Sequence, residues 1–163
     1  MIIVSNHLIG KIPIHPDTVI RVNLAWVKSV EEAKKLLDNS KHDIYLDFPS
    51  GRTKPPQPTI SLEEAIGLSR HRKVKYFAMS NCENVRDIQE VMLKTPAEFV
   101  PKIETKLGVK NMGKMKEIGI KHFMLDKEDL WTDVHCDSKK FNELVNEART
   151  HKGVMELQGV VFI

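Results

Sequence analysis

The stretch FVPKIETKLGVKNM, Phe99–Met112, places the pattern of a buried strand directly before the pattern of a helix. Within EFVPKIE, the apolar and β-branched content over a short length is typical of a strand covered on both faces. A helical face follows, with apolar residues at Val109, Met112 and Met115. A strand that leads into a helix is half of a β-α-β unit, so this stretch predicts an α/β fold with a parallel sheet.

The same pattern recurs along the chain. Further short apolar runs predict strands: IIVS, TVIRVNLA, DIYLDF, VKYFAMS, IKHFMLD and VMELQGVVFI. Amphipathic stretches separate most of them, and two of these open on Ser-x-x-Glu, at Ser29 and Ser61, the signature of a capping box at a helix N-terminus. The sequence therefore predicts about seven parallel strands and five helices.

The number of predicted strands favours a barrel of the TIM type. A complete barrel of this type typically takes about 250 residues, whereas this chain has 163. We therefore expect an α/β fold with a TIM-type parallel barrel that is trimmed or incomplete, and the alternatives are an open doubly wound sheet or a barrel completed by a partner. No linker, repeat or low-complexity tract divides the sequence, which predicts a single domain over residues 1–163.

The composition of the chain indicates which kinds of partner and which cellular compartment to expect. The net charge of +3 comes without a clustered basic face, so we expect no nucleic-acid partner. No run approaches the roughly 20 apolar residues of a membrane span, and the N-terminal apolar run is too short for a signal peptide. The two cysteines, Cys82 and Cys136, form no metal-type pair. These features predict a cytoplasmic protein with no membrane partner.

Charged residues gather at the predicted carboxyl ends of the strands, where parallel α/β folds bind their ligands. They are Arg21 and Asn23, Asp47 followed by Arg52, Lys102 and Glu104, and Asp126, Glu128 and Asp129. Lys102 and Glu104 share one face of their strand because side chains alternate along a strand.

Two interpretations of this charged group compete. Lys102 could simply offset Glu104 or Asp129 as a structural ion pair, since a buried charge needs a partner. Alternatively, Glu104 and Asp129 are oxygen ligands suited to Mg²⁺ or Mn²⁺. Lys102 and Arg21 would then bind an anion or stabilise developing negative charge. The expected ligand is a small oxyacid that chelates the metal.

Several segments resemble the barrel domain of pyruvate kinase, in the superfamily that binds phosphoenolpyruvate or pyruvate. IRVNLA resembles the R-x-N-x-S strand of that family, and IYLDFPSGRT resembles its L-D-L-P-G-P-K-I-R-T segment. YFAMSNCENVRDIQEVM, VPKIETKLGVKNMGKM and HFMLDKEDL are similar to its A-L-S-F-V-R-S-A-E-D-V, I-A-K-I-E-N-P-E-G-V-E-N-I and I-M-V-A-R-G-D-L segments. The matches follow the family order from about residue 18 to residue 131.

The resemblance implies a role for each matching residue. Arg21 would bind the substrate phosphate, and Lys102 would be the catalytic lysine. Glu104 and Asp129 would bind the divalent metal that chelates pyruvate or its enolate. Asn23 and Asp47 would be potassium ligands. Arg52 would lie near the phosphates of a nucleotide.

The chain also departs from the kinase pattern. The capping domain after the third strand and the C-terminal domain have no counterpart, and the expected serine is Ala25. KEDLWTDV is closer to the A-E-D-L-A-A-D motif of citryl-lyase-type enzymes, so a metal-dependent C–C lyase or aldolase is an alternative to a transferase. A degenerate, non-catalytic barrel with a binding role is the second alternative. An incomplete barrel has strand edges that a homodimer would cover.

Overall fold

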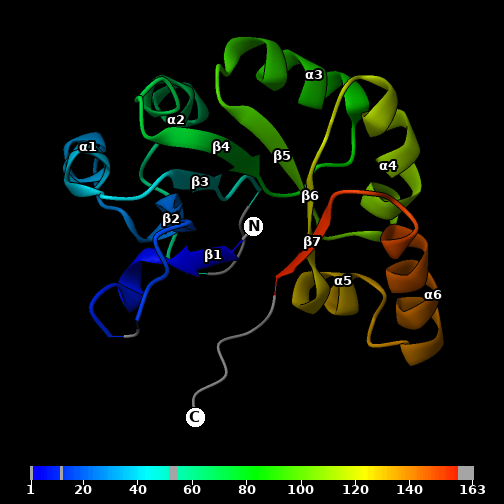
Figure 1. Ribbon diagram of the computed structural model, residues 1–163. Helices are drawn as coiled ribbons and strands as arrows, with labels where there is room; N and C mark the ends of the chain where they lie inside the picture. The colour runs from blue at the N-terminus through cyan, green and yellow to red at the C-terminus, as the bar shows by residue number, and fades with distance from the viewer. Residues whose placement is uncertain (1, 12, 52–54, 158–163) are drawn as a thin grey trace. The chain divides into compact units, whose positions relative to one another are not determined.

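The structure of the protein, a computed structural model, describes residues 2–11, 13–51 and 55–157 (Figure 1). The chain divides into two compact units. The first holds the residues up to Met79 together with Val91–Phe99, and the second holds Ser80–Glu90 together with the residues from Val100 onward. The single domain expected over residues 1–163 stays a prediction.

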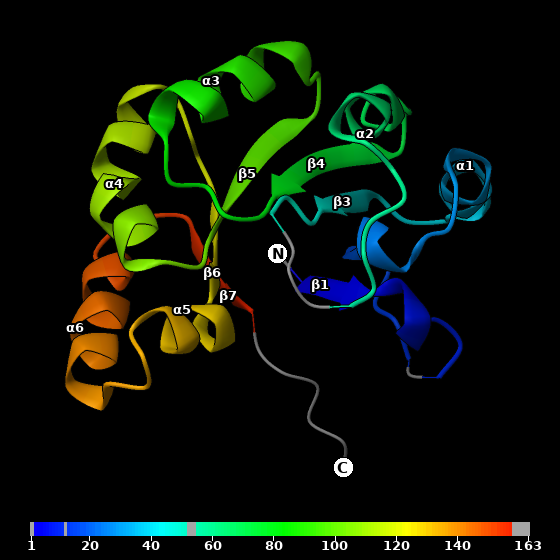
Figure 2. The ribbon, with the colours of Figure 1, turned by 180° about the vertical axis from the view of Figure 1, so that it is seen from behind.

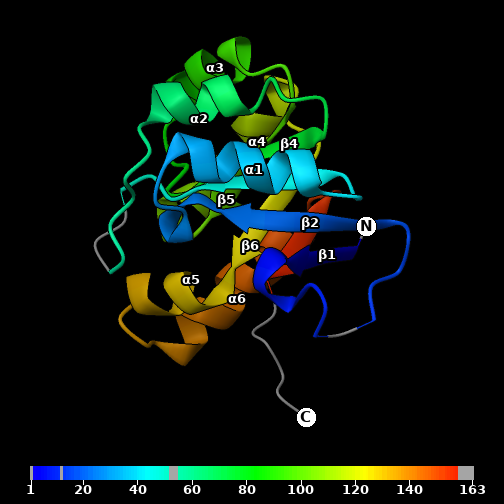
Figure 3. The same ribbon diagram turned by 90° about the vertical axis from the view of Figure 1, so that its left-hand side faces the viewer.

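The first unit is built on four parallel strands, in the order β1 (Ile2–Ser5), β2 (Thr18–Asn23), β3 (Ile44–Phe48) and β4 (Val74–Met79). All five residues of β3 are buried, as expected for a strand covered on both faces. The helices α1 (Val30–Asn39) and α2 (Leu62–Leu68) pack beside each other in this unit (Figure 3). In the register of β2 with β3, Asn23 lies opposite Asp47.

The second unit holds three further parallel strands, β5 (Glu98–Ile103), β6 (Phe123–Asp126) and β7 (Val154–Leu157). The first two residues of β5 belong to the first unit, and α3 (Val85–Lys94) likewise has residues in both units. The helix α4 (Lys106–Glu117) packs beside α6 (Ser138–Arg149), as Figure 2 shows from behind. The predicted helical face of α4 is confirmed, since Val109, Met112 and Met115 are buried.

The strand order decides the fold class. Within the described residues there are seven strands, and their order runs from β1 to β7 without reversal. A doubly wound sheet reverses its order at a switch point, so that alternative is excluded. Parallel strands that follow one another in chain order around the sheet are typical of the TIM type, which has eight strands when complete. The predicted incomplete TIM-type α/β fold is confirmed.

The structure has six α-helices in its described part, one more than the five predicted. The additional helix is α5 (Lys127–Asp133), which follows β6 without a loop. Asp126 is its N-cap, and the first turn carries Glu128 and Asp129, whose negative charges favour a helix N-terminus. In α5 only Leu130 is buried, so its sequence shows no apolar periodicity.

The two predicted capping boxes differ in the structure. At α2, Ser61 and Glu64 exchange both hydrogen bonds of a capping box. At α1, the Ser29 side chain accepts a hydrogen bond from the backbone N–H of Glu32, but the Glu32 carboxylate accepts from the backbone N–H of Lys28 instead. Both serines nevertheless cap their helices as predicted.

Within the described residues, none of the helices combines the length and the apolar character that a membrane crossing requires.

Candidate metal centre

The site begins with two charged residues at the carboxyl end of β5. Lys102 lies within the strand and Glu104 follows it directly, and their side chains share a face as the alternation predicts. The Lys102 Nζ atom lies 2.5 Å from Glu104 Oε1. Both residues are buried, with exposed fractions of 6% and 4%. The predicted pairing of Lys102 with Glu104 is therefore present.

The loop after β4 supports this pair. The backbone N–H of Asn81 donates a hydrogen bond of 2.7 Å to Glu104 Oε2. Lys102 Nζ donates one of 3.1 Å to the hydroxyl of the buried Ser80. Asn81 has a φ of 55°, in the left-handed region that asparagine tolerates better than most residues. This backbone conformation accompanies the hydrogen bond to the carboxylate.

The junction of β6 and α5 supplies two more carboxylates. Asp126 ends β6, and its side chain caps α5 by accepting from the backbone N–H of Asp129. Lys102 Nζ lies 3.7 Å from Asp126 Oδ2. One carboxylate oxygen from each of Glu104, Asp126 and Asp129 lies within 4.8 Å of the other two. The predicted ligands Glu104 and Asp129 are thus close together, with Asp126 as an additional member.

Burial makes the negative charge of this cluster costly. Glu104 and Asp126 are both buried, and the Lys102 ammonium lies beside both of them. Burial is the main cause that raises the pKa of Glu104 above its ordinary value of 4.5. The Lys102 ammonium opposes that rise and the nearby Asp126 adds to it. Buried carboxylates are costly unless cations compensate their charge.

The donor set fits a hard divalent cation. Mg²⁺ and Mn²⁺ prefer oxygen ligands, and magnesium sites commonly use one or two carboxylates with water and substrate oxygens. Glu104, Asp126 and Asp129 offer carboxylate oxygens only. The residues present therefore fit the predicted divalent metal by their chemistry and their mutual distances.

Three other predicted site residues lie in the first unit. Arg21 Nε donates a hydrogen bond of 2.8 Å to Asp47 Oδ2, and its Nη2 atom contacts the same oxygen. Asn23 uses its side-chain oxygen to accept from the backbone N–H of Ala25, which caps a short 3₁₀ helix, η2 (Leu24–Trp26). Within the described residues, the other Asp47 oxygen, Oδ1, is buried without a hydrogen-bond partner. The predicted roles of Arg21, Asn23 and Asp47 in anion and potassium binding stay predictions.

Arg52, expected near a nucleotide, lies outside the described residues. The sequence places Asp126 at the end of a predicted strand, but the pattern does not assign it to the metal site. The available signal was its place three residues before Asp129, which is the spacing of an N-cap and the backbone N–H that it accepts.

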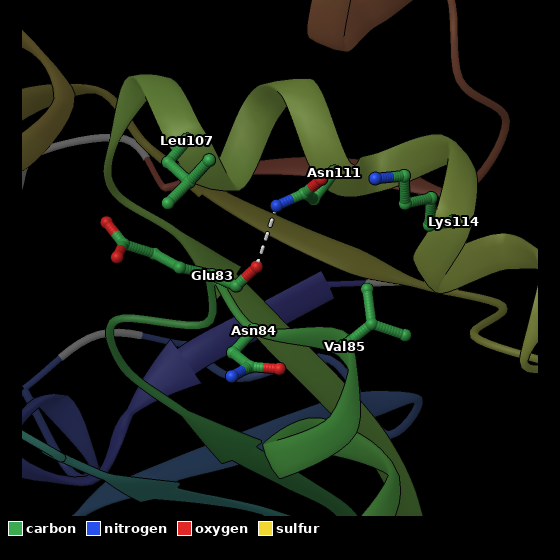
Figure 4. Close-up of a pocket in the computed structure, with 6 residues that line it drawn as sticks. All are labelled: Glu83, Asn84, Val85, Leu107, Asn111 and Lys114. Carbon is green, nitrogen blue, oxygen red and sulfur yellow. Dashed lines mark hydrogen bonds between the residues drawn. The ribbon is translucent and has the colours of Figure 1, made fainter.

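A shallow pocket of about 500 Å³ lies elsewhere in the second unit, between the loop after β4 and helix α4 (Figure 4). Its six lining residues are Glu83, Asn84, Val85, Leu107, Asn111 and Lys114. The Asn111 side chain donates a hydrogen bond of 2.9 Å to the carbonyl oxygen of Glu83, which ties α4 to the loop. None of the three clustered carboxylates is among the lining residues.

The fold and the site together define an incomplete TIM-type α/β protein with a buried carboxylate cluster at the ends of β5 and β6. A solved structure described as a crystal structure analysis of macrophomate synthase matches this fold with a TM-score of 0.54 and 11% sequence identity. The match covers 86% of this chain and 62% of that chain, so this chain corresponds to less than two thirds of that protein. At this identity the similarity shows the fold alone.

A scan against protein-family models and a search of curated proteins find no match.

Proposed function

We propose that this protein is an Mg²⁺- or Mn²⁺-dependent enzyme that binds pyruvate, phosphoenolpyruvate or a related 2-oxoacid and acts through its enolate. The observation that carries the proposal is the cluster of Glu104, Asp126 and Asp129, whose oxygens lie within 4.8 Å of one another. The buried Lys102 beside them adds a positive charge at the same strand ends. Ligand sites of TIM-type folds lie at these ends.

Each residue has a chemical role in this proposal. Glu104, Asp126 and Asp129 hold the cation. When bound, a divalent cation acts as a Lewis acid toward the carboxylate and the keto or enolate oxygen of a 2-oxoacid. Lys102 stabilises negative charge or moves a proton at its Nζ atom.

The resemblance to pyruvate kinase implies further roles for residues of the first unit. By that resemblance Arg21, which donates a hydrogen bond to Asp47, would bind a substrate phosphate. The buried Oδ1 of Asp47 is an acceptor suited to K⁺, and Asn23 lies opposite it in the strand register. Potassium binding by this pair, and nucleotide binding by Arg52, follow from the resemblance to pyruvate kinase.

Phosphoryl transfer and C–C bond cleavage both pass through an enolate, so the carboxylate cluster serves either reaction. The resemblance of KEDLWTDV to citryl-lyase-type enzymes now falls on α5, which places Asp129 beside Asp126. A lyase therefore uses the same residues as the kinase-like alternative. A non-catalytic barrel is less favoured, because the grouping of Glu104, Asp126 and Asp129 is costly for a scaffold that binds no cation.

Calorimetric titration with oxalate, an enolpyruvate mimic, tests the proposal. We expect oxalate to bind in the presence of Mg²⁺ and not in its absence. Asp129→Asn should abolish binding, whereas Glu128→Gln, an exposed neighbour in the same helix turn, should preserve it. Absence of binding in both conditions would reject the proposed function. Metal-dependent binding would justify assays for kinase and aldolase activity.

A further inference from the structure

The Lys102 ammonium contacts two of the three carboxylates that would hold the metal. Its Nζ atom lies 2.5 Å from Glu104 Oε1 and 3.7 Å from Asp126 Oδ2. Both oxygens belong to residues of the carboxylate cluster. Glu104 Oε2 meanwhile accepts from the backbone N–H of Asn81. Both oxygens of Glu104 are therefore engaged by donors of this chain.

A divalent cation bound to Glu104 and Asp126 would lie close to the ammonium. Two positive charges that share the same oxygens repel each other strongly in a buried, weakly screened setting. Lys102 has an alternative partner, because its Nζ atom already donates to the Ser80 hydroxyl at 3.1 Å. Lys102 can therefore move away from the carboxylates and keep the Ser80 hydroxyl as a hydrogen-bond acceptor.

We propose that Lys102 is a tethered competitor of the divalent metal, which the metal displaces from Glu104 and thereby frees to face an anionic ligand. This inference rests on the proposed function and adds an order of binding to it. The ammonium compensates the carboxylates while no metal is bound. Metal binding then couples to ligand binding, because the anion meets a lysine that no longer pairs with Glu104.

The test compares affinities for Mg²⁺ and Mn²⁺ by calorimetry, with the folded state checked by circular dichroism. We expect Lys102→Met to bind Mn²⁺ at least about tenfold more tightly than the wild type, because the repulsion is removed. The same variant should bind oxalate more weakly when loaded with metal. A merely structural lysine would not move these two affinities in opposite directions.

Two control variants isolate the effect of the charge at this position. Lys102→Arg keeps the positive charge and should bind Mn²⁺ no more tightly than the wild type. Lys110→Met removes a lysine whose Nζ lies 2.5 Å from Glu147 on α6, and it should leave the metal affinity unchanged. Equal Mn²⁺ affinity of the wild type and Lys102→Met would overturn the inference while leaving the proposed function intact. Failure of all variants to bind metal would overturn both.

If Lys102→Met does not fold, a measurement on the wild type tests whether the metal displaces Lys102. The ammonium group of Lys102 is followed by nuclear magnetic resonance while Mg²⁺ is added. We expect its signal to shift as Mg²⁺ saturates the protein. An unchanged ammonium signal at full Mg²⁺ occupancy, established by calorimetry, would overturn the inference.

Discussion

The pairing of Lys102 with Glu104 is expected both for a structural ion pair and for a metal site. The pair alone therefore does not distinguish these two interpretations. A buried ion pair often contributes little net stability, because desolvation offsets the attraction between the charges. The third and fourth members of the cluster change this balance. Asp126 and Asp129 bring two further carboxylates close to Glu104. The arrangement is better suited to binding a cation than to closing a structural pair.

Asn81 provides a residue-scale prediction. Its φ of 55° accompanies the hydrogen bond from its backbone N–H to Glu104 Oε2. Asn81→Gly keeps that N–H and adopts the left-handed region readily, so we expect near-wild-type Mn²⁺ affinity. Asn81→Val forces a β-branched residue into the same region at a cost of roughly 1–2 kcal/mol. We expect a lower melting temperature and weaker Mn²⁺ binding. Equal Mn²⁺ affinities of the two variants would contradict this role.

Side-chain alternation was enough to place Lys102 and Glu104 on one face, because the strand period is a local property of the chain. The contact of Arg21 with Asp47 could not be predicted in the same way. It joins residues 26 positions apart and depends on the register of β2 against β3. The support of Glu104 by Asn81 depends likewise on a loop conformation that the sequence does not specify.

At the scale of elements, α5 shows how a short helix builds the site. The other five helices have periodic apolar faces or capping residues that made them predictable. In α5 only Leu130 is buried, so the helix leaves almost no apolar pattern. Its N-cap Asp126 and first-turn Asp129 are at once helix-forming residues and candidate ligands. The site therefore depends on the one helix that the sequence did not predict.

Glu156 gives an element-scale prediction about pH. This β7 residue accepts hydrogen bonds from Arg149 on α6 and Lys127 on α5. These hydrogen bonds lower the pKa of Glu156 from 4.5 to about 2, and the one from Arg149 has the largest effect. Because the folded-state pKa is the lower one, the contacts stabilise the folded protein above pH 4.5. That stabilisation is lost as the pH falls from 4.5 toward 2.

Urea unfolding between pH 2 and pH 7 measures this contribution. We expect Glu156→Gln to be less stable than the wild type at pH 7, and the difference to shrink as the pH falls through this window. Glu143→Gln removes an exposed carboxylate of α6 and serves as the control for lost charge. A wild-type advantage over Glu156→Gln that stayed constant down to pH 2 would contradict the assignment.

At the scale of the whole molecule, the number of strands was predictable from the sequence. Whether the strands close into a complete barrel was not. Seven apolar runs, each followed by a turn or a helix, indicate a TIM-type order because connections in such folds are short and local. The sequence contains no comparable signal for what covers the first and last strands. In the structure, the strand order begins at β1 and ends at β7.

The exposure of these end strands supports the expected homodimer. Ile3, Val4 and Ser5 of β1 are half-buried, as are Val154, Met155 and Glu156 of β7, whereas every residue of β3 is buried. End strands that are incompletely covered invite pairing with another chain. We expect sedimentation velocity to show a mass that rises toward twice 18.7 kDa as the concentration increases through the micromolar range. Backbone pairing and apolar contacts do not depend on attraction between charges. The dimer should therefore persist at 1 M NaCl, where the Debye length is only about 3 Å. A single species of monomer mass at every concentration would reject the dimer.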